Sequence, residues 1–200
     1  PTSLLAMVDS SVGGKTAVDL PEGKNLLGTF TQPYLVLCDS KALDTLAPEV
    51  FAEGMAEVIK YGMIRSRELL ELLLRDEAAE ELEHIIAQCV RLKRDVVAED
   101  EQDFGERQIL NFGHTLGHAI EREMNYKLFH GDCVAIGMAL MTRALVRDGR
   151  CPESCEKILE KLLKKYQLPN NTELPSERIL AAARADKKRR GENITLIEPN

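Results

Sequence analysis

The chain has 200 residues, of which 44% are apolar and 30% charged, with a formal net charge of −7. A chain of this size and composition can bury a substantial core. Its acidic balance argues against a general nucleic-acid-binding protein, because affinity for the phosphate backbone depends on clustered Lys and Arg. No apolar run approaches the roughly 18 residues of a membrane span, and no secretory leader pattern precedes residue 8, so we expect no membrane partner and a cytoplasmic location.

The cysteines indicate neither a disulfide framework nor a thiolate zinc site. The chain has 5 of them, scattered and without a C-x-x-C pair. We therefore expect them to be reduced.

Residues 1–46 have the pattern of short strands and turns. Apolar runs bounded by turn residues predict strands at 4–8 and 34–38, with Gly and Pro in the segments 13–14, 21–23 and 32–33 marking hairpins or loops. The expected fold class begins with this α/β edge.

The pattern along residues 47–200 predicts a mostly α-helical domain with a short strand at 194–197. Apolar residues recur there at a spacing of three to four, which is typical of helices. The expected helices are 53–64, 77–98, 107–124, 133–147, 152–166 and 176–185.

The predicted helix 107–124 carries an unusual polar stripe. Its other positions are mostly apolar, so the helix should be buried, and a buried polar stripe must face a cavity, a ligand or a metal. On one continuous helix the stripe residues fall within an arc of about 80°. They are Arg107, Asn111, His114, His118 and Glu121.

The two histidines of this stripe, together with a carboxylate from another segment, are candidates for a catalytic zinc site. Such sites commonly use two His and one carboxylate and leave a position open. Glu57, in an apolar helical segment, is the candidate carboxylate, and His130 stands at the start of a predicted helix. Alternatives remain open, because His pairs four residues apart also occur on surface helices, and a surface Glu57 that pairs with Lys60 at i,i+3 fits the sequence equally well. We interpret His84, in a Glu-rich segment, as a surface residue.

Several blocks of the chain, in the same order and spacing, resemble 3-dehydroquinate synthase within the sugar phosphate cyclases. The blocks are LAMVDSSVGGKT at 5–16, GKN at 23–25, GMAEVIKYG at 54–62, LNFGHTLGHAIE at 110–121, HG at 130–131 and DKK at 186–188. The resemblance covers essentially the whole chain.

The resemblance implies a lyase that uses NAD and zinc, or another divalent metal such as cobalt. Its small-molecule substrate would be a phosphorylated sugar acid, 3-deoxy-D-arabino-heptulosonate 7-phosphate, which it converts to 3-dehydroquinate and phosphate in the shikimate pathway of aromatic amino acid biosynthesis. It also implies a homodimer. The family's glycine-rich nucleotide site has no counterpart in these residues, so we expect a piece of a longer protein in which 1–46 form the edge of the NAD-binding domain and 47–200 bind metal and substrate.

The resemblance also implies roles for individual residues. The metal ligands would be Glu57, His114 and His130, and His118 would move protons near the substrate phosphate. The substrate carboxylate would be held by Lys93 and Arg107. The phosphate and neighbouring oxygens would be contacted by Lys15, Asn25, Asn111 and Lys187. The hydroxyls around the reacting carbon would be contacted by Asp9 and Lys60. The residues near NAD would be Thr2, Ser3, Asp9, Lys15, Lys24 and Thr45.

The chain departs from the family pattern at Asp19, where Asn is usual, and at Asp132, where Glu is usual. Other sugar phosphate cyclases, including those that make 2-deoxy-scyllo-inosose, valiolones or aminodehydroquinate, remain alternatives. A glycerol-type alcohol dehydrogenase is disfavoured, because it needs fewer groups for a phosphate and a carboxylate than this chain offers. These groups are Lys15, Lys93, Arg107 and Lys187. A non-catalytic helical interaction domain is disfavoured by the intact polar stripe.

Overall fold

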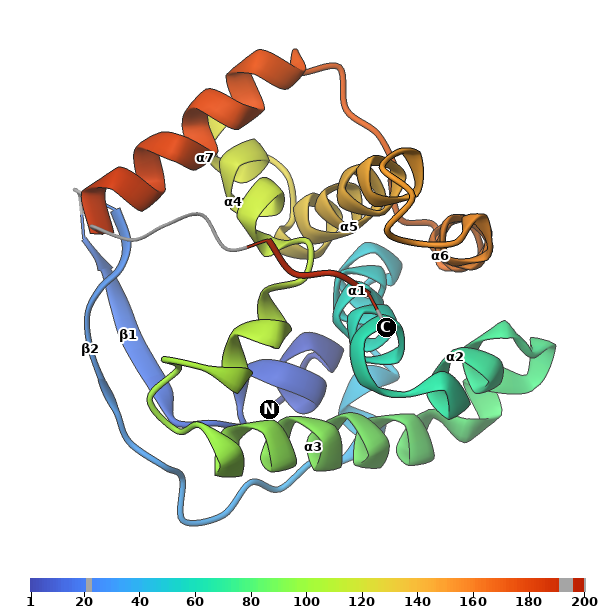
Figure 1. The fold of residues 1–200 in the computed structure, drawn as a ribbon. Helices are drawn as coiled ribbons and strands as arrows, with labels where there is room; N and C mark the ends of the chain where they lie inside the picture. The colour runs from blue at the N-terminus through green and yellow to red at the C-terminus, as the bar shows by residue number, and fades with distance from the viewer. Residues whose placement is uncertain (21–22, 191–195, 200) are drawn as a thin grey trace.

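The computed structural model describes residues 1–20, 23–190 and 196–199, with the backbone alone at 19, 23, 24 and 186–190. A short helical turn and a two-stranded hairpin precede a body of packed helices (Figure 1). This order confirms the expected fold class. No helix among the described residues is long and apolar enough to cross a membrane.

The prediction of a strand at 4–8 is wrong, because this segment is helical. It enters η1, a π-helical turn at Ala6–Ser10, and Ser3 Oγ accepts a hydrogen bond from the Ala6 N–H at 3.3 Å. Leu4, Met7 and Val8 are fully buried. A short apolar run fits a buried strand or a buried helical turn equally well, so periodicity could not separate the two.

The predicted hairpin is confirmed as strands β1 (Lys15–Leu20) and β2 (Gly23–Phe30). They pair antiparallel, with Lys15 opposite Phe30, and the register shifts between Val18 and Leu20. The strand predicted at 34–38 is wrong for this structure: the segment lies in no helix or strand, pairs with no strand among the described residues, and leaves Leu37 77% exposed. An apolar run becomes a strand only where a partner completes its hydrogen bonds.

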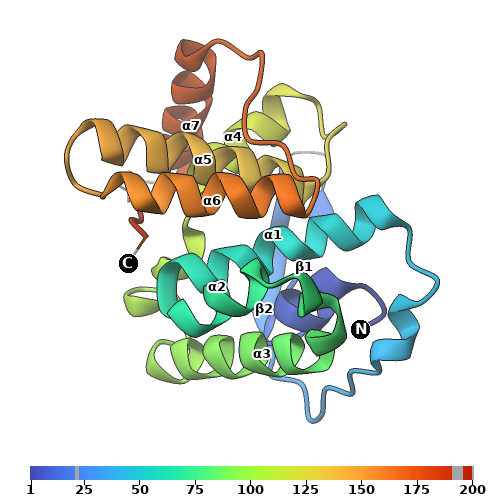
Figure 2. The same cartoon turned by 90° about the vertical axis from the view of Figure 1, so that its right-hand side faces the viewer.

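Helix α1 (Pro48–Arg65) runs through the middle of the molecule in both views (Figures 1 and 2). Every residue from Gly54 to Ile64 is buried, including charged ones. It extends beyond the predicted 53–64, and the short turn η2 (Ser40–Leu43) precedes it. Helix α2 (Arg67–Leu74) was not predicted, although Ser66 caps it by accepting a hydrogen bond from Leu69 N–H at 3.1 Å.

The helix predicted at 77–98 is divided in the structure. The 3-10 turn η3 (Asp76–Glu81) comes first, and α3 (Leu82–Glu99) follows and lies along η1.

The single helix predicted at 107–124 is wrong, because the chain breaks at Gly113. A 3-10 turn, η4 (Glu106–Asn111), precedes the break, and α4 (His114–Glu123) follows it. Gly113 has φ +77°, and a Cβ there would lie 2.5 Å from Met138 Cγ and 2.8 Å from the Val134 carbonyl oxygen. Position 113 therefore needs glycine, both for its left-handed backbone and for the close approach of the helix that carries Val134 and Met138. Arg107 and Asn111 consequently do not share a helix with His114 and His118.

Helices α5 (His130–Arg147), α6 (Glu153–Lys165) and α7 (Ser176–Arg190) complete the body. α4 packs against both α5 and α7, and α1 packs against α5. One core cluster joins η1 and α1–α3 to α5 and α6, and a second lies among α4, α5 and α7. Of the strand predicted at 194–197, residues 194–195 lie outside the described residues, and 196–197 are not in a strand.

The packing of α1 against α5 generates a stability prediction at Gly131. A Cβ at Gly131 would lie 2.3 Å from the Glu53 carbonyl oxygen. We expect Gly131→Ala to lower the free energy of unfolding by about 1–3 kcal/mol through overpacking. Denaturant unfolding measures this, with Ala144→Ser, an exposed position on the same helix, as the control. Equal stability of the two variants would contradict the close packing of α1 on α5.

Candidate functional site

A group of buried charges lies where α1 passes the turn η1. Glu57 and Lys60, one turn apart on α1, are 0% and 1% exposed. The Lys60 ammonium pairs with Glu57 Oε2, and its Nζ lies 3.7 Å from Asp9 Oδ2 on η1. The predicted i,i+3 pair between Glu57 and Lys60 is therefore present, but in the interior rather than on the surface. The metal-ligand role of Glu57 stays a prediction.

Lys93 of α3 and Tyr61 of α1 also reach Asp9. Lys93 Nζ donates to the Asp9 carbonyl oxygen at 2.7 Å and pairs with Asp9 Oδ1. The Tyr61 hydroxyl donates to the same Oδ1 at 3.0 Å. Asp9 thus takes donors from two helices, while part of its side chain, 18%, remains exposed.

Three histidine rings gather on the other side of Glu57. His114 Nε2 and His130 Nε2 lie 3.4 and 3.5 Å from Glu57 Oε1. His118, one turn beyond His114 on α4, has its ring centroid 5.4 Å from that of His114. One ligand atom from each histidine falls within 4.8 Å of the others. His114 starts α4 and His130 starts α5, and α5 packs against both α1 and α4, which brings these groups together.

Partners on the far side of the rings orient two of these histidines. His114 Nδ1 lies 3.1 Å from the Phe112 carbonyl oxygen, which can only accept, so Nδ1 carries a proton and Nε2 is the nitrogen that faces Glu57. His130 Nδ1 faces Glu121 Oε2 at 3.9 Å.

The charges shift each other's protonation. Burial alone would raise the pKa of the Glu57 carboxyl, but Lys60 and His114 outweigh burial and hold that pKa well below its usual range. Burial would also raise the pKa of the Asp9 carboxyl, but Lys60 and Lys93 outweigh burial and lower that pKa. Burial would lower the pKa of His130, but Glu121 and Glu57 raise it to about 10. The two carboxylates therefore favour a cation at this position.

The donor set fits a divalent metal. Both Glu57 oxygens are buried and have no hydrogen bond of adequate geometry among the described residues, although Lys60 neutralises Oε2. Oε1 is the atom that both His Nε2 atoms approach. Two imidazole nitrogens and one carboxylate oxygen are a common catalytic zinc set. His118, which is exposed, is close enough to be a fourth donor.

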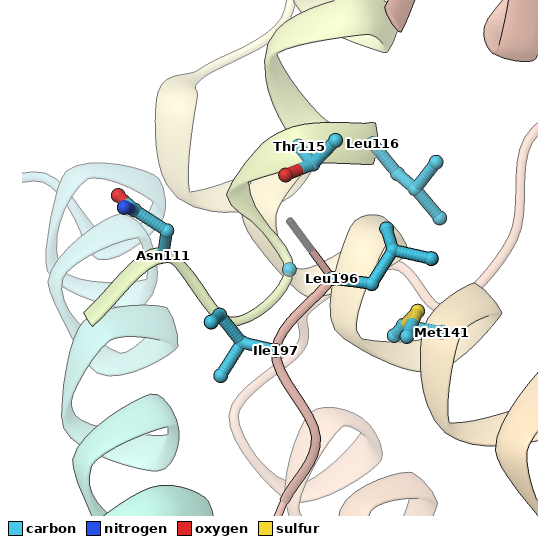
Figure 3. Close-up of a pocket in the computed structure, with 7 residues that line it drawn as sticks. Asn111, Thr115, Leu116, Met141, Leu196 and Ile197 are labelled. Atoms are coloured by element: carbon cyan, nitrogen blue, oxygen red, sulfur yellow. The ribbon is translucent and has the colours of Figure 1, made fainter. Parts of the chain in front are cut away.

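The predicted anion-binding residues come from several separate segments of the chain. Lys15 at the start of β1 pairs with Asp103 at 2.5 Å. Arg107 is buried and donates to the Gly13 and Glu101 carbonyl oxygens at 2.8 and 2.7 Å, which ties the loop before η4 to the turn before β1. Asn25 is exposed on β2 with φ 55°. Figure 3 shows Asn111 at a small pocket beside the start of α4, which Thr115 and Ile197 also line.

The residues predicted near NAD lie mostly on the surface. Thr2 is exposed before η1, Ser3 is half-buried, and Thr45 is exposed after η2. At Lys24, on β2, and Lys187, on α7, the structure describes the backbone alone.

Sequence reasoning missed Tyr61 as a member of the site. The available signal was its place in the apolar segment 54–62, next to Lys60, where a buried phenol needs a polar partner. Glu121 was recognised only as part of the stripe, and it faces His130 through the packing of α4 on α5.

Curated proteins with related sequences include the 3-dehydroquinate synthases of Clostridium acetobutylicum and Methylacidiphilum infernorum. They are 49% and 46% identical over 98% of this chain. The chain spans 57% and 56% of the length of these relatives.

Similar solved structures are sugar phosphate cyclases. The 2-epi-5-epi-valiolone synthase of Streptomyces hygroscopicus, solved with NAD+ and Zn2+ bound, matches with a TM-score of 0.85 and 26% identity over 95% of this chain and 55% of that one. The 2-deoxy-scyllo-inosose synthase in complex with carbaglucose-6-phosphate, NAD+ and Co2+ matches with a TM-score of 0.84 and 29% identity over 100% of this chain and 60% of that one.

Family models divide the chain between two parts of one enzyme family. Residues 1–53 match the model for the N-terminal part of 3-dehydroquinate synthase, and residues 54–189 match the model for its C-terminal part. With these matches and the sequence identity above, the chain belongs to the 3-dehydroquinate synthase family.

Proposed function

We propose that the protein carrying this chain is a 3-dehydroquinate synthase, which converts 3-deoxy-D-arabino-heptulosonate 7-phosphate to 3-dehydroquinate and phosphate with NAD and a divalent metal. The observation that carries the proposal is the convergence of Glu57 Oε1 with His114 Nε2 and His130 Nε2 at 3.4 and 3.5 Å. The identity of 49% to a curated synthase favours this substrate over those of the cyclases that are 26% and 29% identical.

In this proposal Glu57, His114 and His130 hold the metal, and zinc suits the set. When bound, zinc supplies Lewis acidity that lowers the pKa of substrate hydroxyls and orients the carbon from which NAD takes hydride. Lys60 neutralises the Glu57 oxygen that is turned away from the histidines. This leaves Oε1 for the cation, and the three donors need not rearrange to converge.

Asp9, Lys60 and His118 act on the substrate around this centre. The lowered pKa of Asp9 keeps its carboxylate ionised, so it accepts hydrogen bonds from substrate hydroxyls. Lys60, whose Nζ lies 3.7 Å from Asp9 Oδ2, donates to the same hydroxyls. His118 is exposed beside the other two rings, which suits a group that takes a proton from substrate carbon and returns one to an oxygen.

Cationic and amide groups from several segments bind the two anionic ends of the substrate. Lys93 has three donors and the contacts with Asp9 occupy two, so one donor is left for the substrate carboxylate. Arg107 also binds the substrate carboxylate, in addition to its structural contacts with the Gly13 and Glu101 carbonyl oxygens. The groups that serve the phosphate are Lys15, Asn25, Asn111 and Lys187.

We assign contacts with NAD to Thr2, Ser3, Asp9, Lys15, Lys24 and Thr45. Residues 1–46 then belong to the edge of the NAD-binding domain, and 47–200 to the domain that binds metal and substrate. The expected homodimer and cytoplasmic location stay predictions.

The direct test of this function is release of phosphate from 3-deoxy-D-arabino-heptulosonate 7-phosphate by the whole protein, with catalytic NAD and with zinc. We expect turnover that stops when a chelator removes the metal and resumes when zinc is restored. Glucose 6-phosphate, which lacks the carboxylate that Lys93 and Arg107 would bind, serves as the control substrate. Preference for glucose 6-phosphate would assign the protein to a different cyclase.

A second prediction concerns the metal ligands. His114→Ala removes one donor and should abolish stoichiometric zinc binding, because two remaining protein ligands hold zinc weakly. Metal content after dialysis, or calorimetric zinc titration, measures this. His84→Ala is the matched control, since His84 is exposed on α3 and contacts Gln88. Unchanged zinc content in His114→Ala would remove His114 from the metal site.

A third prediction separates His118 from the ligands. His118→Asn keeps a hydrogen-bonding side chain but cannot exchange a proton near neutral pH. We expect zinc and substrate binding to persist while turnover falls by about 10²–10⁴-fold, the usual contribution of general acid–base catalysis. Near-normal turnover would exclude His118 from proton transfer, and loss of zinc would make it a ligand.

A further inference from the structure

Tyr61 is a buried polar residue beside the site that the roles described so far leave unused. It follows Lys60 on α1 and is 0% exposed, within the main core. Its hydroxyl donates to Asp9 Oδ1 at 3.0 Å. A phenylalanine would fill the same apolar space without burying a hydroxyl, so the contact with Asp9 is what distinguishes tyrosine at this position.

The contacts of Asp9 are divided between its two carboxylate oxygens. Oδ1 receives the Tyr61 hydroxyl and the Lys93 ammonium, which come from different helices. Oδ2 faces Lys60 Nζ at 3.7 Å, which is longer than a hydrogen bond. Two donors on one oxygen fix the plane of the carboxylate and leave the accepting capacity of the other oxygen available.

The phenol is suited to act as a fixed donor. Burial, together with the nearby carboxylates of Asp9 and Glu57, raises the pKa of Tyr61 well above its ordinary value, so the hydroxyl stays protonated. Its ring is packed in the core and cannot swing away. Lys93, by contrast, divides its donors between Asp9 and its further proposed role toward the substrate carboxylate.

We propose that Tyr61 is a positioning residue that holds Asp9 Oδ1, so that Oδ2 is presented to the substrate hydroxyls whether or not Lys93 turns toward the substrate. The role rests on the proposed function, in which Asp9 accepts those hydroxyls. Tyr61 itself does not touch the substrate. Its effect should therefore appear in the catalytic step more than in substrate binding.

The experiment compares Tyr61→Phe with Tyr166→Phe in the whole protein. Tyr166 also donates from a core-packed ring, to the Leu73 carbonyl oxygen at 3.1 Å, but between α6 and the end of α2. Both changes remove one hydroxyl and one hydrogen bond. We expect Tyr61→Phe to lower kcat about tenfold and to change KM less than about twofold, as misorientation of a catalytic group does. Tyr166→Phe should leave both constants unchanged at a similar melting temperature.

Crystal structures of the two variants supply a readout that does not depend on activity. In Tyr61→Phe the Asp9 carboxylate should rotate or occupy two conformations, and in Tyr166→Phe it should not. If wild type releases no phosphate, the proposed function fails, but this comparison still decides whether Tyr61 orients Asp9. An unmoved Asp9, an unchanged kcat, or a Tyr61→Phe protein that fails to fold while Tyr166→Phe folds would each overturn the proposal and leave Tyr61 a structural residue.

Discussion

The arrangement of the site depends on one buried carboxylate, that of Glu57. It lies on the most buried stretch of α1 and has no hydrogen bond of adequate geometry among the described residues. An ionised carboxylate in the interior is stable only when cations or donors compensate its loss of water. Lys60 provides compensation on one oxygen and the two histidines approach the other. Removing either side would leave an uncompensated charge in the core.

Packing determines which groups can reach Glu57. His114 and His130 are the first residues of α4 and α5, so their side chains project from helix starts toward α1. The break at Gly113 turns η4 away from α4, and the close approach of Gly131 to Glu53 holds the start of α5 on α1. Asp9 arrives separately, on the buried turn η1, where α3 supplies Lys93. Five separate segments thus meet at one charged centre, which explains why candidate ligands are far apart in the sequence.

Much of the site could be predicted from the sequence, and the failures have physical causes. The apolar neighbours of Glu57 correctly predicted its burial, and the prediction that His130 stands at the start of a helix is confirmed. The polar stripe was wrong as one helix face, because periodicity does not detect the left-handed backbone at Gly113. The segment 4–8 was too short for its period to separate helix from strand. The contact between Tyr61 and Asp9 joins residues 52 positions apart, and only tertiary packing brings them together.

The central claim is that Glu57, His114 and His130 form a metal site with room left for substrate. Anomalous diffraction from crystals of the whole protein loaded with zinc tests this most directly. The account predicts one ion at about 2.0–2.2 Å from Glu57 Oε1, His114 Nε2 and His130 Nε2, with His118 outside bonding distance. An ion bound by the three histidines without Glu57, or no ion at this position, would contradict the account.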